Sequence, residues 1–338
     1  MKVLIVMGHP AHVHFFRHYM KEMEDRGHEI MVCVKLREIT TKLLDIYDIP
    51  YKTFGKTYPN QPAKAWGIVM NDLRLLNFAR RFKPDLTASI GGLYSVHAGA
   101  CLSVPSIDFM DTENATLTNA ITFPLATVVA TPDCYAGKVP SRKHRPYPGY
   151  HELAYLHPSR FSPDMKKLEP LGVGPRDYIV VRFSTLDASH QMGEAVLNQD
   201  EKIELVKELS SHCRVFVDCE GEMPKELDGN ALKIQPHHYH HLLAFARLYV
   251  GEGATAASEA GVLGVPWIYI SGDRRGYLDD QERTYGLGKT VKSKTHAIET
   301  VKELMKKPPS HYELVRKKLL NEKIDVTSWM VELSEEFL

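Results

Sequence analysis

The strongest constraint on the fold is an alternation of strands and helices that occurs twice along this 338-residue chain. In the first half, apolar runs predict buried strands at 2–7, 29–34, 86–90 and 125–130, with helical segments between them. One such segment carries Phe16, Tyr19, Met20 and Met23 at the spacing of an amphipathic helix. Strands interleaved with helices imply parallel sheets covered on both faces, so we expect an α/β fold.

A change of composition separates the two halves. Prolines accumulate and periodicity fades over residues 131–176, which predicts an interdomain connection. Alternation then resumes, with strands expected at 178–183, 214–218, 232–234, 248–250 and 267–270, and a charged helical tail follows over about 312–338. The chain length suits two domains. We place them at residues 1–165 and 166–312, with a C-terminal helix at 313–338.

Charge and apolar content exclude several classes of protein. Lysine and arginine (42) balance aspartate and glutamate (42), so no global basic field favours nucleic acid. No stretch approaches the ~18 apolar residues of a membrane span, which leaves only peripheral membrane contact open. The opening residues, 2–7, have the apolar pattern of a buried strand, and no long apolar core with a cleavage site follows, as a signal peptide would require. Five cysteines without CxxC spacing fit a reduced, cytoplasmic protein.

The segment 251–266 carries the most specific functional pattern. Gly251 and Gly253 follow a predicted strand and allow a sharp turn in which the backbone can approach a ligand. The helix that begins near Ala254 would direct free amides and its positive dipole end at that point, as in a diphosphate site. The side chains expected to assist are the hydroxyls of Thr255 and Ser258, for the phosphates, and the carboxylate of Glu259, for two vicinal hydroxyls.

Two other interpretations of this segment remain open. Gly251-x-Gly253-x-x-Ala256 also matches the dinucleotide-binding fingerprint, and Asp273 lies near the spacing of its ribose acid. That fingerprint normally follows the first strand of its unit, however, whereas here several strands precede it. The other interpretation is a glycine-rich turn that only packs a helix on a sheet.

Several segments resemble a known superfamily. Gly253-Ala254-x4-Glu259-Ala260-x3-Gly264-x-Pro266 resembles the donor-binding signature of GT-B glycosyltransferases and of the non-hydrolysing UDP-N-acetylglucosamine 2-epimerases. The opening segments 8–14 and 27–30 resemble the first loop and helix of those proteins. Three further segments, 9–16, 149–156 and 181–183, resemble an uncharacterised GT-B family, domain of unknown function 354. The similarity to that family extends nearly from one end of the chain to the other.

The resemblance implies a GT-B fold, in which two Rossmann-like domains with parallel sheets face a central cleft. It implies a nucleotide-diphosphate sugar in the second domain, and an acceptor or the reacting sugar in the first. It also implies that the last helix returns to the first domain. No cofactor is expected beyond the nucleotide sugar, which acts as the substrate.

The first loop offers candidates for a catalytic base. Gly8 and the residues after it follow the first strand, at the sheet edge where open α/β folds bind ligands. His12 or His14 could accept a proton from an acceptor hydroxyl, since imidazole titrates near neutral pH. Alternatively, His14 and His18 are only packing or surface residues of a helix. No metal is expected, because the cluster lacks an HExxH pair and a nearby cysteine.

An acidic segment, 108–114, follows another short strand. Asp111 and Glu113 could act as acid and base, as an acidic segment at the comparable place does in the 2-epimerases that this chain resembles. The histidine-valine-glutamate-alanine-glycine run of those enzymes is absent here. The alternative, which we favour slightly, is a helix N-cap by Asp111 or Thr112 with Glu113 in the first turn.

Four further residues are candidates for donor binding in the second domain. Arg182 and Ser184 end its first strand and could contact a phosphate. His190 lies roughly where the 2-epimerases that this chain resembles have a substrate-binding histidine. His237 could lie beside the nucleotide base of the donor. We expect the neighbouring His238, His240 and His241 to be solvated helix residues.

Together these features favour a metal-independent GT-B glycosyltransferase with a UDP-linked donor and an acceptor that the sequence does not specify. A 2-epimerase using Asp111 and Glu113, and a nucleotide-sugar-binding protein without catalysis, are the alternatives.

Overall fold

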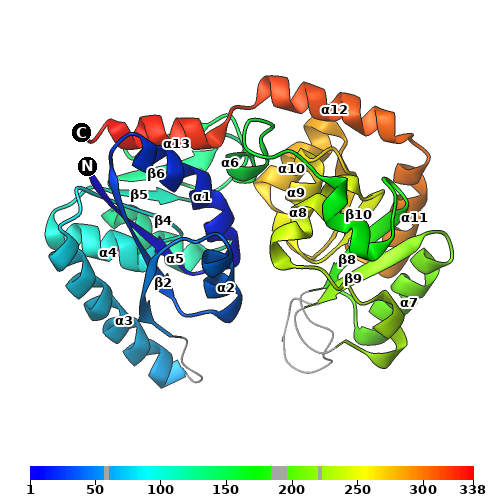
Figure 1. The fold of residues 1–338 in the computed structure, drawn as a ribbon, viewed down its shortest axis with the longest axis horizontal. Helices are drawn as coiled ribbons and strands as arrows, with labels where there is room; N and C mark the ends of the chain where they lie inside the picture. The colour runs from blue at the N-terminus through cyan, green and yellow to red at the C-terminus, as the bar shows by residue number, and fades with distance from the viewer. Residues whose placement is uncertain (57–60, 184–195, 220–222) are drawn as a thin grey trace. The chain divides into compact units, whose positions relative to one another are not determined.

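The structure, a computed structural model, describes residues 1–56, 61–183, 196–219 and 223–338; for 61–65 it describes the backbone alone. The chain forms two compact units (Figure 1). Unit 1 consists of Met1–Tyr155 together with Ile324–Leu338, and unit 2 of Leu156–Lys323. Each is described by itself below.

Unit 1 contains a parallel sheet. Its seven described strands lie in the order β3-β2-β1-β4-β5-β6-β7. Val3, Leu4 and Ile5 of the central strand are fully buried, as expected where helices cover both faces. The strands are β1 (Lys2–Met7), β2 (Glu29–Lys35), β3 (Tyr51–Gly55), β4 (Leu86–Ile90), β5 (Ser106–Phe109), β6 (Val128–Pro132) and β7 (His144–Tyr147).

The helices of unit 1 pack by the apolar stripes that the sequence predicts. In the first of them, Phe16, Tyr19 and Met20 are buried, and the ring of His9 caps the amino end by accepting a hydrogen bond from the Ala11 amide. The helices are α1 (Pro10–Asp25), α2 (Glu38–Ile46), α3 (Gln61–Phe82), α4 (Leu93–Leu102), α5 (Thr116–Leu125), the short α6 (Leu153–Leu156) and α13 (Val326–Glu335).

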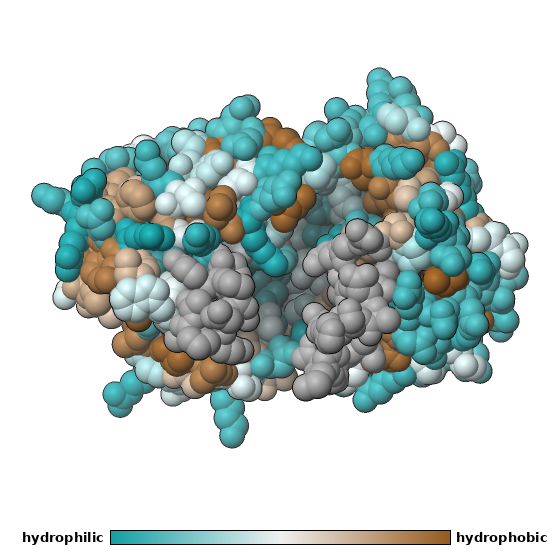
Figure 2. Space-filling view, turned by 90° about the horizontal axis from the view of Figure 1, so that it is seen from below, coloured by the Kyte–Doolittle hydropathy of each residue, from teal (hydrophilic) through white to brown (hydrophobic). Residues whose placement is uncertain are grey.

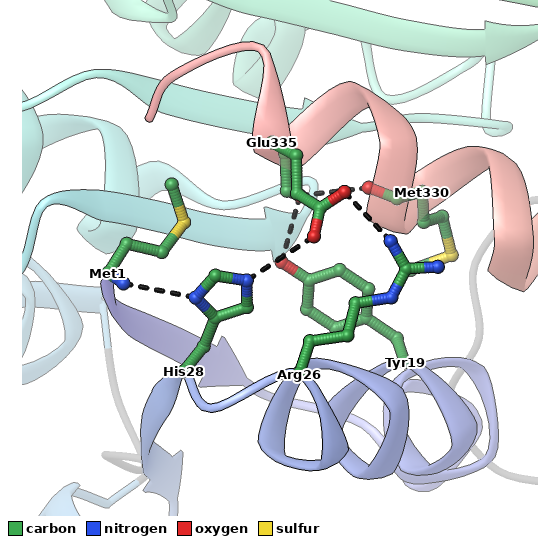
Figure 3. Close-up of polar contacts among 7 residues, drawn as sticks. Met1, Tyr19, Arg26, His28, Met330 and Glu335 are labelled. Carbon is green, nitrogen blue, oxygen red and sulfur yellow. Dashed lines mark hydrogen bonds and ion pairs between the residues drawn. The ribbon is translucent and has the colours of Figure 1, made fainter.

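The last helix, α13, is fastened to α1 by polar contacts (Figure 3). The Tyr19 hydroxyl lies 2.8 Å from Ser334 Oγ, buried between the two helices. Arg26 donates to the Glu335 carboxylate at 2.8 Å, and the ring of His28 lies 3.4 Å from it. These contacts join the C-terminal segment of the chain to the first helix of the same unit.

Unit 2 holds the second parallel sheet, with five described strands in the order β12-β11-β10-β8-β9. Its core is formed by apolar residues of the central strands packed against α7 and α11. The strands are β8 (Tyr178–Phe183), β9 (Arg214–Cys219), β10 (Leu248–Gly251), β11 (Trp267–Ile270) and β12 (Gly288–Val291). The helices are α7 (Gln199–Ser210), α8 (Tyr239–Phe245), α9 (Ala254–Val262), α10 (Gly276–Asp280), α11 (Lys294–Met305) and α12 (Pro309–Glu322).

The predicted α/β class with two parallel sheets is confirmed, but some predicted elements are wrong. Residues 232–234 form no strand, because only Ala231 bridges to β9 and Pro236 soon starts a helical turn. The predicted single helix at the C-terminus is two helices, and the Asp325 carboxylate caps the second. The unpredicted strand β7 lies at the sheet edge, where its proline is tolerated.

Candidate functional site

The turn between β10 and α9 in unit 2 is built around two glycines with different roles. Gly251 pairs with Arg182 of β8, and a Cβ at Gly251 would lie 2.2 Å from the Arg182 carbonyl oxygen. Glycine is therefore required there by the packing of the strands. Gly253 is the N-cap of α9, and the Tyr249 hydroxyl donates to its carbonyl at 3.0 Å.

The amino end of α9 is partly open to solvent. Gly253, Ala254 and Thr255 are half-buried, whereas the rest of the helix is buried. Among the described residues, no side chain caps this end. The first amides of the helix are therefore available to an anion, which the helix dipole also favours.

Charged side chains fix this turn to the strands and helices around it. Glu252, between the two glycines, forms a buried ion pair of 2.8 Å with Lys202 of α7. Arg182 pairs with Asp218 of β9, and its guanidinium lies 6.0 Å from the centre of the Tyr239 ring. The Arg182 side chain thus lies beside Gly253, in a position to share its charge with an anion at the turn.

The two predicted side chains deeper in α9 are buried. Ser258 is fully buried, and its hydroxyl accepts a hydrogen bond of 2.9 Å from Gln281. The Glu259 carboxylate lies 2.9 Å from His240 Nε2 of α8, and both side chains are buried. The prediction that His240 is solvated is therefore wrong, because this residue faces α9 rather than water.

The remaining donor-side candidates fall in different places. His237 lies half-buried in the turn before α8, where burial lowers its pKa, and its ring packs against that of His238. Ser184 and His190 lie outside the described residues.

In unit 1, three distant segments meet at the carboxyl edge of the sheet. His12, in the first turn of α1, is half-buried, and its Nδ1 lies 3.4 Å from the Gly8 amide. Burial lowers the pKa of His12 to about 3, although the nearby Asp111 carboxylate opposes this shift. His12 is therefore neutral at physiological pH, and it is a weaker base than an ordinary histidine.

Asp111 forms an ion pair with a histidine that the sequence interpretation did not select. His151 Nδ1 lies 3.2 Å from the Asp111 carboxylate, and Thr112 donates to the other carboxylate oxygen at 2.8 Å. Burial alone would raise the pKa of Asp111, but the charge and hydrogen bond of His151 lower it to about 2. The Asp111 carboxylate thus contacts His151 and interacts electrostatically with His12.

His151 was missed because it lies in the proline-rich connection, where the sequence shows no periodicity. The segment 149–156 carries the resemblance, and that was the only signal. Its Nε2 is buried without a hydrogen-bond partner among the described residues. The ring packs against Phe15, with centroids 4.5 Å apart, and is parallel to that of Tyr147.

The other two predicted catalytic residues are directed elsewhere. His14 is buried on α1, and its ring lies 5.6 Å from that of Tyr155. A Glu113 carboxylate oxygen lies 3.3 Å from the Ala136 amide, which donates to it. His12 and Asp111 are thus brought together, whereas Glu113 turns towards another loop.

A second carboxylate of unit 1, that of Asp108, has a pKa shifted in the opposite direction from that of Asp111. Asp108 on β5 is fully buried, and burial raises its pKa to about 7 even though the Gly92 amide donates to it at 2.9 Å. Two aspartates three positions apart therefore differ in protonation near neutral pH. Asp111 is ionised, and Asp108 titrates.

The described residues hold neither a candidate metal site nor a membrane-spanning helix. Within them, no group of three or more histidine, cysteine, aspartate or glutamate side chains is placed to hold a metal ion. Nor is any helix there long and apolar enough to cross a membrane.

Solved structures that are similar to this chain include GT-B proteins. The UDP-GlcNAc 2-epimerase from Neisseria meningitidis bound to UDP-GlcNAc is similar over 99% of this chain and 100% of its own, with a TM-score of 0.72 and 17% identity. The spinosyn forosaminyltransferase SpnP is similar over 100% and 99%, with a TM-score of 0.67 and 12% identity. The chain therefore has the GT-B fold, as the sequence predicted.

The sequence comparisons point to a family without an assigned activity. Uncharacterized protein MJ0665 of Methanocaldococcus jannaschii is 24% identical over 281 residues, which are 79% of this chain and 80% of that protein. The model of the family described as protein of unknown function (DUF354) matches residues 1–333. This chain belongs to that family, DUF354.

Proposed function

We propose that this protein binds a nucleotide-diphosphate sugar, with UDP as the nucleotide, through unit 2 and transfers the sugar to an acceptor hydroxyl without a metal ion. The observation that carries the proposal is the half-buried, uncapped amino end of α9 beside Arg182. It is supported by the GT-B fold, which this chain shares with the Neisseria meningitidis enzyme bound to UDP-GlcNAc.

In this proposal the diphosphate accepts hydrogen bonds from the first amides of α9, while Arg182 adds positive charge. These donors are fixed by the fold, so they stabilise the negative charge that grows on the leaving diphosphate without reorganising. Glu259 accepts hydrogen bonds from the ribose hydroxyls, and His240 holds its carboxylate in place.

The acceptor is activated by His12 and Asp111. His12 takes the proton of the acceptor hydroxyl as its oxygen attacks the anomeric carbon and the bond to the diphosphate breaks, and the nearby Asp111 carboxylate, which raises the pKa of His12, favours this transfer. The ionised Asp111 stabilises the imidazolium that forms, and the contact with His151 orients Asp111.

Replacement of Gly253 tests the donor site. In Gly253→Asp the new carboxylate would cap the amides of α9, which suits the helix but repels a diphosphate. The backbone of Gly253 is extended, with φ −88°, so other residues are allowed. Gly253→Ala is the control for side-chain volume.

Calorimetry with UDP should show weaker binding for Gly253→Asp by about 100-fold, and near-normal binding for Gly253→Ala. Equal UDP affinity in both variants would contradict the proposal.

The acidic segment after β5 supports a second candidate, a 2-epimerase. Asp111 is ionised beside His151, an arrangement that could also remove and return a proton on the sugar. Incubation with UDP-GlcNAc in deuterated water separates the candidates. Epimerase action would put deuterium on C2 of the sugar, and transfer or hydrolysis would release UDP. A protein that only binds the nucleotide sugar would do neither.

A further inference from the structure

Helix α5 of unit 1 exposes an apolar face. Leu117, Ile121 and Leu125 recur every four residues and are exposed, Leu117 to 77%. Ala120 and Pro124, between them, are exposed as well. The helix Thr116–Leu125 contains no charged residue. Exposed helix positions are normally polar, so a continuous apolar row on the outer face calls for a binding partner.

A second apolar row lies on α3, two helices away. Trp66, Val69 and Leu73 follow helical spacing and are exposed, Trp66 to 64%. Helix α4 packs against both α3 and α5, so the three helices lie side by side on unit 1. Brown surface gathers at the lower edge of this unit in the space-filling view (Figure 2). We call the outer surface of α3, α4 and α5 the helical face.

The two sequence segments that carry the apolar rows of α3 and α5 are rich in basic residues, although the whole chain is neutral. Residues 66–83 contain one acid, Asp72, whose carboxylate lies 3.1 Å from His97. Residues 114–148 contain one acid, Asp133. The exposed cations of these two segments are Arg74, Arg80, Arg81, Lys83, Lys138, Arg142 and Arg145.

We propose that the helical face binds the surface of an anionic phospholipid membrane. Apolar side chains of a surface helix insert at the boundary between headgroups and acyl chains, and tryptophan prefers that depth. The exposed basic residues of these segments are attracted to anionic headgroups. A second copy of this chain fits less well, because a self-complementary contact would bring the same cations together.

This proposal goes beyond the proposed function and does not depend on it. The test is flotation of the full chain with vesicles of phosphatidylcholine, with and without about 30% phosphatidylglycerol. The wild-type protein should float with the anionic vesicles, and about 0.5 M salt should release it. In Leu117→Gln/Ile121→Gln the bound fraction should fall by about tenfold or more. Leu314→Gln, an exposed leucine of unit 2, is the matched control and should bind like wild type.

Tryptophan fluorescence gives a second readout. Trp66 is exposed, whereas Trp329 of α13 is half-buried and Trp267 is fully buried, so vesicle binding should shift the emission of the wild type to the blue and leave Trp66→Phe unshifted. Absence of flotation with anionic vesicles would overturn the proposal. So would a wild-type dimer in sedimentation equilibrium that Leu117→Gln/Ile121→Gln converts to a monomer. UDP affinity should be the same in all these variants, which keeps this test separate from that of the donor site.

Discussion

The two candidate sites differ in how the chain builds them. In unit 2, the turn and the first two turns of α9 come from one continuous segment, Gly251–Glu259. In unit 1, the site joins His12 after β1, Asp111 after β5 and His151 in the connection after β7. A site made of one segment is fixed by local backbone geometry. A site made of three requires the whole sheet to be in place.

They also differ in chemistry. The unit 2 turn offers backbone amides, which do not titrate, and an arginine paired with Asp218. The unit 1 site consists of groups whose pKa values are shifted by burial and by one another. We therefore expect substitutions in unit 2 to change nucleotide affinity, and those in unit 1 to change turnover and pH dependence.

The largest effect is expected from removal of Asp111. In Asp111→Ala the imidazolium that forms on His12 would lose its counter-charge, and the rate of UDP release from UDP-GlcNAc should fall by about 1000-fold. The affinity for UDP, measured by calorimetry, should stay within about twofold, because binding rests on α9. Asp25→Ala, at the exposed end of α1, is the control. An equally large loss of UDP affinity in Asp111→Ala would contradict the expectation that unit 1 controls turnover and unit 2 controls nucleotide affinity.

The next effect distinguishes the two glycines of the turn. Gly251→Ala should lower the free energy of unfolding by about 3 kcal/mol, since its Cβ would overlap the backbone of Arg182. Gly253→Ala should cost less than about 1 kcal/mol, because the atoms nearest to its Cβ belong to the Tyr249 and Arg182 side chains, at 3.0 Å or more, and not to the backbone. Urea unfolding measures both. Equal losses would mean that Gly253, too, is required only for packing.

The sequence could predict the unit 2 turn because the information is local. Two glycines after an apolar strand and before a helix of small residues specify the geometry almost alone, and the structure has this strand, turn and helix. The role of Gly251 in strand packing could not be inferred, since the partner backbone at Arg182 is 69 positions away in the sequence. The burial of His240 was missed for the same reason, because its partner lies on another helix.

The unit 1 site could be predicted only in pieces. The positions of Gly8 and His12 followed from the rule that parallel sheets bind ligands at their carboxyl edge. The pairing of Asp111 with His151 depends on how the connection after β7 folds back, and prolines there remove the periodic pattern that would place it. Tertiary packing, rather than local preference, decides such contacts.

A smaller effect is expected from the pair His240–Glu259 in unit 2. Glu259→Ala leaves His240 Nε2 buried without its partner, so the free energy of unfolding should fall by about 2 kcal/mol. UDP should also bind about tenfold more weakly if Glu259 holds the ribose. His240→Ala and the double variant complete a double-mutant cycle, which should give a coupling near 1 kcal/mol. Unchanged UDP affinity in Glu259→Ala would remove Glu259 from the donor site and leave it a structural role.

The smallest effect is expected from Asp108, whose pKa is shifted in the opposite direction from that of Asp111. The folded protein raises the pKa of Asp108 to about 7, above the unfolded value, so it holds a proton that the unfolded chain has released. The stabilisation is full below the unfolded pKa and is lost as the pH rises through about 7. For Asp111, whose pKa is lowered, the stabilisation is lost only as the pH falls towards about 2.

Between about pH 6 and about pH 8, Asp108 alone should therefore reduce the free energy of unfolding by about 1 kcal/mol. Asp108→Asn keeps an oxygen to accept from the Gly92 amide but cannot titrate, so its stability should lack this decline. The quantity to measure is the difference between wild type and Asp108→Asn at each pH, by urea unfolding, because the titration of histidines in the unfolded chain cancels in it. A difference that does not change with pH would show that Asp108 is ionised in the folded protein. Asp108 and Asp111 would then both carry charge at this edge of the sheet.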